Sequence, residues 1–138
     1  LIRTPEVTNA VKFLADIPDD RKELVTQQRR IGESKSVVAE GRDTGTVVFP
    51  DADFKFYFDA PLEIRARRRH EEFLKKGIET GRREVREDLI KRDRDDKSRP
   101  VGALRLAEDG IVIDTGDTDE VEKNLKKILL KIDASDLQ

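Results

Sequence analysis

The stretch that decides the fold is GRDTGTVVFP, residues 41–50, which directly follows the short apolar run Ser36–Glu40. Such a run predicts a buried strand, and the glycines after it allow the backbone to approach a ligand closely. The guanidinium of Arg42 matches the spacing of phosphate oxygens, and Asp43 can accept a hydrogen bond from an amino group or orient the arginine. The alternative interpretation is an Arg-Asp ion pair that only terminates the strand.

Two further stretches, Phe54–Asp59 and Ile111–Asp114, are also predicted to be strands that end in an acidic residue. Helices are expected at 4–30, interrupted at Pro18 with a second helix from Asp19 or Asp20 to Ile31, and at Pro61–Lys76, Arg82–Lys97 and Thr118–Ile132. Strands that alternate with helices indicate an α/β fold with a parallel sheet. Ligands of such sheets bind beyond the carboxyl ends of the strands, which draws attention to residues 41–43, 59–61 and 115–117.

The composition narrows the function classes. The 138 residues have 42% charged side chains and a net charge of −2, but residues 65–99 hold 14 Lys or Arg against 9 Asp or Glu. A basic middle in an acidic chain favours a local anionic ligand over a nucleic acid. The absence of cysteine excludes disulfides and thiolate chemistry, and the single histidine, His70, argues against a histidine metal site or a Ser-His triad. The sequence shows no membrane-span pattern and no signal peptide, so we expect a cytoplasmic protein.

The basic middle contains two groups of regularly spaced side chains. The first is Arg65, Arg68 and Arg69, which share one helical face, with Arg67 pointing elsewhere. The second is Arg92, Asp96 and Arg99, whose spacing places two guanidiniums around one carboxylate. These residues could form a solvated helix with many salt bridges, or a lid of arginines over a polyphosphate. A basic helix that binds RNA or DNA is a third interpretation, which the interleaved acids and the scarcity of Tyr and Trp disfavour.

These stretches occur together, and in the same order, in one known family. The chain resembles bacterial cytidylate kinases, which phosphorylate CMP and dCMP with ATP. The resemblance rests on residues 2–7, 38–52, 58–60, 65–69, 90–96 and 113–115, and most strongly on the string GRD-x-GTVVFP-D-A. It implies a P-loop NTPase-like fold of the nucleoside monophosphate kinase type, with a parallel sheet and flanking helices.

The resemblance also implies a role for individual residues in CMP binding. Arg42 resembles the family's arginine on the CMP phosphate, a catalytic role, and Asp43 the carboxylate that reads the cytosine edge. Arg21 matches an arginine that also contacts cytosine. The remaining residues of the implied CMP pocket are Arg92, Asp96 and Arg99. Lys12 stands where the family often has a serine that touches the base, so hydrogen bonding there is expected to differ.

On the ATP side, the resemblance implies a lid whose arginines close over the phosphates. These arginines are Arg65, Arg68 and Arg69, and Arg68 is expected to be catalytic. The complete enzyme would use ATP and Mg²⁺, with no metal ligands from this chain, and would be a monomer that acts on CMP or dCMP. We expect neither a nucleic-acid nor a membrane partner.

The phosphate-binding loop of the family, G-x-x-x-x-G-K-[ST], does not occur in these 138 residues, and the chain begins with Leu1 and has no methionine. We therefore expect a C-terminal part of a kinase, a single domain with an incomplete sheet and negligible phosphoryl transfer of its own. Within it we expect a helical CMP-binding region at 1–32, core sheet and helices at 36–60 and 111–132, and a lid at 61–100. Self-association could cover an exposed strand edge. A non-catalytic module that binds pyrimidine nucleotides is the alternative function.

Overall fold

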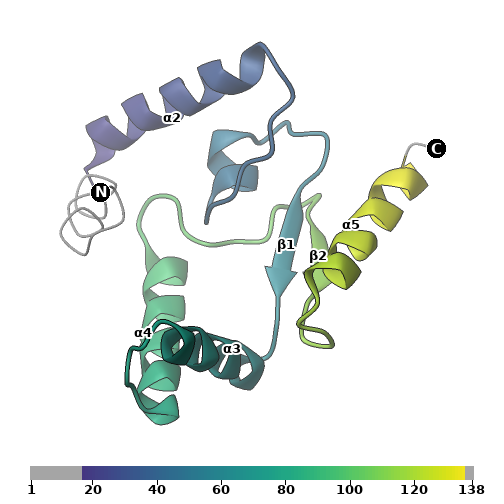
Figure 1. Ribbon diagram of the computed structural model, residues 1–138. Coiled ribbons are helices and arrows are strands. Elements are labelled where there is room, and N and C mark those ends of the chain that lie inside the picture. The colour runs from purple at the N-terminus through teal and green to yellow at the C-terminus, as the bar shows by residue number, and fades with distance from the viewer. Residues whose placement is uncertain (1–16, 136–138) are drawn as a thin grey trace.

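The computed structural model of the chain describes residues 17–135 (Figure 1). Its elements are α2 (Pro18–Glu33), a π-helical turn η1 (Thr44–Val48), β1 (Phe56–Asp59), α3 (Leu62–Lys75), α4 (Arg82–Ser98), β2 (Ile111–Asp114) and α5 (Val121–Ser135). The helix expected within residues 4–16, together with Lys12, lies outside the described residues. The α/β class predicted from the sequence is confirmed.

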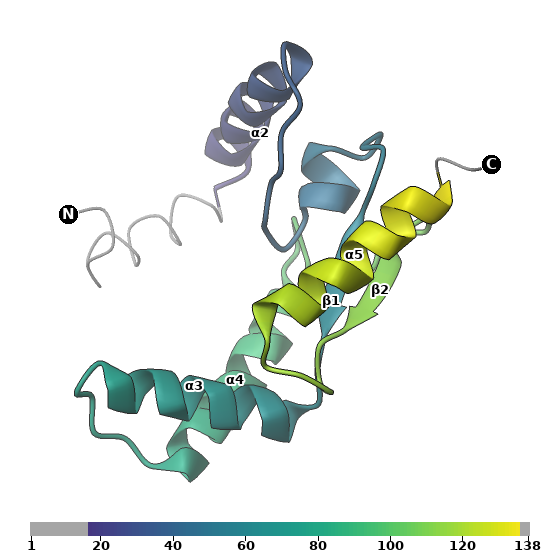
Figure 2. The ribbon, with the colours of Figure 1, turned by 45° about the vertical axis from the view of Figure 1, so that its right-hand side comes forward.

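The sheet has two parallel strands, β1 and β2, in the register Phe56 to Ile111 and Asp59 to Asp114. Backbone hydrogen bonds continue beyond both ends of the pairing, because Ile111 N donates to Lys55 O at 2.8 Å and Thr115 N donates to Asp59 O at 2.8 Å. The prediction for β2 is confirmed, and β1 begins two residues later than predicted. In Figure 2, α5 runs alongside this sheet.

The strand predicted at Ser36–Glu40 is wrong. This segment has no regular secondary structure, and all of its residues are exposed, Val38 fully. A strand forms only where a neighbouring strand pairs with its backbone groups. Among the described residues β1 pairs with β2 and no strand lies beside Ser36–Glu40, so the apolar run has no partner that would make it a strand.

The helix boundaries, unlike this strand, depend mainly on the residues at the helix ends. The second helix predicted from Asp19 or Asp20 is confirmed as α2, which begins at Pro18, because the first turn of a helix does not need the N–H that proline lacks. α3 ends just before Gly77, whose φ of 70° lies in the left-handed region that favours glycine. α5 begins at Val121, three residues later than predicted. The preceding turn is held by Thr118 Oγ1, which accepts a hydrogen bond from Glu120 N at 3.1 Å.

Side-chain burial is limited among residues 17–135. The buried apolar residues are small or medium-sized: Val48, Ala60, Ala66, Val85, Ala103 and Ile113. Ala66 and Val85 lie in α3 and α4, which pack together as a pair (Figures 1 and 2). Phe58, by contrast, is 56% exposed. None of the helices in residues 17–135 is both long and apolar enough to cross a membrane.

Candidate functional site

Asp96 is the centre of an arginine cluster at the C-terminal end of α4. Asp96 is buried, with 7% of its surface exposed. Arg42 Nε donates a hydrogen bond to Asp96 Oδ2 at 3.1 Å, and Arg99 Nη2 lies 3.2 Å from Oδ1. Arg92 Nε lies 3.8 Å from Oδ2, a longer ion pair. We call these four residues the Asp96 cluster.

Two parts of the chain build the Asp96 cluster. Arg92 and Asp96 are four residues apart on α4, as the sequence spacing predicted. Arg99 is the first residue beyond the helix, and Leu104 N donates to Asp96 O at 2.7 Å, which turns the chain back toward the carboxylate. Arg42 comes from the glycine-containing turn before η1. The structure therefore pairs Arg42 with Asp96, and the simple Arg42–Asp43 ion pair considered from the sequence is not what forms.

The charge of the Asp96 cluster suits an anion. Three guanidiniums surround one carboxylate, so the cluster carries a net charge of about +2. A buried carboxylate needs such partners, because an unpaired charge is costly to bury. The side chains of Arg42 and Arg92 nevertheless stay 41% and 58% exposed. Donors that Asp96 does not use thus face solvent, where phosphate oxygens can accept hydrogen bonds from them.

Arg21 and Asp43 form a second pair nearby. The Nη2 of Arg21, on α2, donates to Asp43 Oδ2, and each side chain is only 14% exposed. Arg21 Nε is buried without a hydrogen-bond partner, so this donor is left for an acceptor that the described residues do not supply. Gly102, with φ 68°, lies against this pair, and a Cβ there would be 2.7 Å from Asp43 Oδ2. Nothing in the sequence pattern singled out Gly102 beyond its position after Pro100.

Two contacts that the sequence did not predict hold the glycine-containing turn in place. Arg29, on α2, donates from Nη2 to Val47 O at 2.6 Å and from Nε to Val48 O at 2.9 Å. Both carbonyls belong to η1, so one arginine fixes the turn that follows Arg42 and Asp43 against α2. A contact between an arginine and backbone carbonyls cannot be predicted from a sequence pattern, because every residue has a backbone carbonyl that could accept the hydrogen bond.

The lid arginines predicted from the sequence do not point to one place. Arg65 binds the carboxylate of Asp93 on α4 with two hydrogen bonds, at 3.0 and 2.8 Å, and donates to Ala60 O at 3.0 Å. The hydrogen bonds to Asp93 raise the pKa of Arg65 above its ordinary value. Arg65 therefore connects α3, α4 and the end of β1.

Arg68 binds the loop between β2 and α5. It donates to Asp119 Oδ1 at 2.6 Å, to Thr118 O at 2.8 Å, to Thr115 Oγ1 at 3.3 Å and to Thr115 O. Arg67 also reaches Asp119, at 2.6 Å, so it joins Arg68 instead of pointing elsewhere as predicted. The hydrogen bonds from Arg67 and then from Arg68 lower the pKa of Asp119 below its ordinary value.

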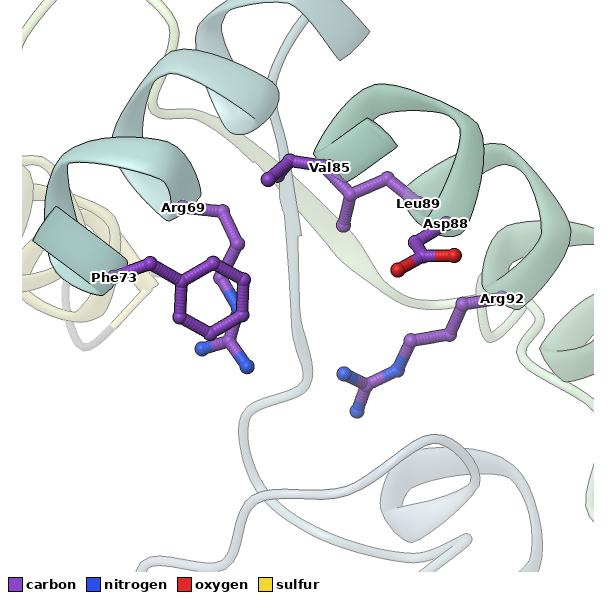
Figure 3. Close-up of a pocket in the computed structure, with 6 residues that line it drawn as sticks. All are labelled: Arg69, Phe73, Val85, Asp88, Leu89 and Arg92. Carbon is purple, nitrogen blue, oxygen red and sulfur yellow. The ribbon is translucent and has the colours of Figure 1, made fainter. Parts of the chain in front are cut away.

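Arg69 lies in a different environment from Arg65 and Arg68. Its guanidinium stacks over the ring of Phe73, 4.4 Å from the centroid, and its Nη1 donates to Glu72 at 2.7 Å. Figure 3 shows Arg69 from α3 and Arg92 from α4 on either side of one small cavity of about 160 Å³. Val85 and Leu89 also line this cavity. Of the three expected lid arginines, Arg69 is thus the one that shares a cavity with a residue of the Asp96 cluster.

The described residues do not by themselves fit an ATP–magnesium group. Residues 17–135 contain no set of three or more Asp, Glu or His side chains that could hold a metal ion. Arg65 and Arg68 are already bound by protein acceptors. We therefore derive no catalytic step through ATP or magnesium from these side chains.

Comparison with known proteins gives the family. The model of the family described as cytidylate kinase matches residues 1–133. The chain is 49% identical to a cytidylate kinase of Caldanaerobacter subterraneus over 121 residues, which are 88% of this chain and 54% of that protein. It is 45% identical to the enzyme of Carboxydothermus hydrogenoformans over 94% of this chain and 58% of that protein. It is 45% identical to one from Streptococcus pyogenes over 83% and 50%. The chain spans about half the length of these relatives, and it belongs to the cytidylate kinase family.

Proposed function

We propose that this chain carries the monophosphate-binding half of a cytidylate kinase. The complete protein would transfer a phosphoryl group from ATP to CMP or dCMP, with Mg²⁺, in the cytoplasm where these nucleotides are found. The observation that carries the proposal is the Asp96 cluster, in which a buried carboxylate holds three arginines at one place and leaves their outer donors free for a phosphate. The family membership supports the choice of nucleotide.

In this proposal the Asp96 cluster and the Arg21–Asp43 pair bind different parts of the nucleotide. Arg42 binds the phosphate of CMP, and Asp96 positions it, with Arg92 and Arg99 completing the pocket for phosphate and ribose. A guanidinium on a phosphate spreads the negative charge that repels an incoming phosphoryl group, which is the assistance that phosphoryl transfer needs. Arg42 thus acts on substrate in both binding and catalysis.

Arg21 and Asp43 read the base. Cytosine differs from uracil by an exocyclic amino group, which can donate a hydrogen bond to the Asp43 carboxylate, and Arg21 can donate to the ring carbonyl. The buried and unpartnered Nε of Arg21 supports this assignment, because a donor of that kind calls for an acceptor from a ligand. Residues 61–100 would form the lid, with Arg69 at the cavity it shares with Arg92, while Arg65 and Arg68 would have to leave their present acceptors to reach ATP.

The chain has no P-loop motif, and the side chains described above serve the acceptor nucleotide. We therefore expect CMP binding without appreciable turnover from this chain alone. A module that only binds pyrimidine nucleotides would use the same pocket, and it is distinguished by whether a longer form of the protein that contains a P-loop phosphorylates CMP.

The base-reading part is tested with the variant Asp43→Ala. Nuclear magnetic resonance titrations of the chain with CMP and with UMP should show that the variant loses roughly 10-fold in affinity for CMP, the value of about one hydrogen bond to a charged group, and much less for UMP. Equal losses for both nucleotides would remove Asp43 from base reading and leave the phosphate site unaffected.

A further inference from the structure

Helix α2 holds the segment that begins at Asp43 by both of its ends. Arg21, in the first turn of α2, pairs with the carboxylate of Asp43. Arg29, about two helical turns further along, donates to the backbone carbonyls of Val47 and Val48 in η1. Val48 is buried, with 3% of its surface exposed, so its carbonyl depends on a donor from the protein. One helix therefore binds a side chain at the start of the segment and the backbone at its end.

The η1 turn connects these two contacts. The amides of residues 46, 47 and 48 donate to Asp43 O at 3.2, 2.8 and 3.2 Å, so the backbone of Asp43 belongs to the turn. Gly32, in the last turn of α2, lets the end of the turn approach the helix, since a Cβ at that position would lie 2.8 Å from Cε1 of Phe49. A shift of η1 relative to α2 would therefore move Asp43 relative to Arg21.

Arg42 and Asp43 are neighbours in the sequence, but they are anchored to different elements. Arg42 donates a hydrogen bond to Asp96 on α4, a contact in which α2 takes no part. Asp43 is held by α2, directly through Arg21 and through the η1 backbone by Arg29. Loss of the Arg29 contacts should therefore loosen the carboxylate of Asp43, while the guanidinium of Arg42 keeps its partner.

We propose that Arg29 is a positioning residue for cytosine recognition. It fixes η1 against α2, so that the Asp43 carboxylate stays beside Arg21, where the amino group of cytosine binds. This inference rests on the proposed function and adds a residue that acts on the base through Asp43. Arg29 does not itself touch the nucleotide, because backbone carbonyls occupy its Nε and Nη2 and about 12 Å of helix separates it from Arg21.

The test compares Arg29→Gln with the unchanged chain in nuclear magnetic resonance titrations with CMP, UMP and ribose 5-phosphate, which has the phosphate but no base. Glutamine lacks the fork of donors that binds two carbonyls at once. The affinity for CMP should fall roughly 5-fold, and the affinities for UMP and ribose 5-phosphate by less than about 2-fold. Arg30→Gln is the matched control, because Arg30 is an exposed neighbour on α2 that makes neither of these hydrogen bonds, and it should change none of the three affinities.

A double substitution separates positioning from direct contact. In the Asp43→Ala background, Arg29→Gln should lower the affinity for CMP by less than about 2-fold more, because the carboxylate that Arg29 positions is already absent. A further loss as large as in the single variant would overturn the proposal. Equal losses for CMP and ribose 5-phosphate in the single variant would overturn it too, since Arg29 would then support the phosphate site or the fold as a whole.

A second variant covers the case in which Arg29→Gln does not fold. Arg29→Lys keeps the charge and can donate to one carbonyl at a time, and it should lower the ratio of CMP to UMP affinity at least ~2-fold. An unchanged ratio would overturn the proposal. The unchanged chain separates this result from the proposed function: equal affinities for CMP and UMP would contradict base reading and both proposals, whereas a preference for CMP that survives the loss of Arg29 would contradict only the role of Arg29.

Discussion

Arginines occur in two regions of this molecule that differ in their balance of charge. In the Asp96 cluster three guanidiniums share one carboxylate, and two of them remain largely exposed. Along α3, Arg65, Arg67 and Arg68 are met by carboxylates and carbonyls of α4 and of the loop before α5. An arginine that is already matched by protein acceptors holds structure together, whereas one in excess of its partners can bind a ligand. Residue type alone does not separate the two cases.

The largest expected effect is that of Arg42→Ala on CMP binding. Removal of a charged donor to the phosphate should lower the affinity for CMP by roughly 100-fold. It should lower the affinity for UMP equally, because a phosphate contact does not depend on the base. Calorimetric titration measures both affinities. Arg94→Ala, an exposed arginine of the same basic run, is the control, and a loss there as large as at position 42 would mean that general charge, not the cluster, binds the nucleotide.

Asp96→Asn tests the centre of the same cluster. The substitution keeps the shape of the side chain and removes the charge that three arginines share, so the free energy of unfolding should fall by about 2 kcal/mol. Urea denaturation gives this value. Added inorganic phosphate should recover part of the loss, since an anion can replace the missing charge. A loss below about 0.5 kcal/mol would show that Asp96 does not hold the arginines together.

The complementary prediction concerns Arg68, in the region where charge is balanced. Arg68→Ala should lower the free energy of unfolding by about 1 kcal/mol through the lost hydrogen bonds to the 115–119 loop, and should leave CMP affinity unchanged. Thermal unfolding and CMP titration of the same variant measure the two properties. A variant of normal stability that binds CMP poorly would reverse the comparison between the two regions.

The smallest effect is a pH dependence at Asp119. Its pKa is lowered in the folded chain, chiefly by the hydrogen bond from Arg67, so its stabilising contribution is complete above the ordinary aspartate pKa of 3.8. The contribution is lost as the pH falls through the lower folded value, because protonation then breaks the contacts. The difference in melting temperature between the chain and Asp119→Asn should therefore be constant near neutral pH and shrink below about pH 4. A difference that grows in acid would contradict this sign.

The features of this molecule that could be predicted from its sequence are those that depend on residues near one another along the chain. Helix boundaries such as Arg82 to Ser98 follow from periodicity and from Pro100, and the grouping of Arg92 with Asp96 follows from helical spacing. The strand at Ser36–Glu40 could not be judged locally, because a strand depends on a neighbour elsewhere in the chain. Likewise, nothing local distinguishes Arg68, bound to a loop about fifty residues away, from Arg42, which binds Asp96 through Nε and stays 41% exposed.

The most direct test of the central claim is calorimetric titration of this chain with CMP and, separately, with ATP and with cytidine. The claim is that the chain holds the acceptor-nucleotide site, built on the Asp96 cluster. It predicts one CMP bound per chain, with ATP and cytidine binding at least ~10-fold more weakly, since cytidine lacks the phosphate and ATP has the wrong base for Arg21 and Asp43. Tighter binding of ATP than of CMP, or no binding of CMP at millimolar concentration, would contradict the account.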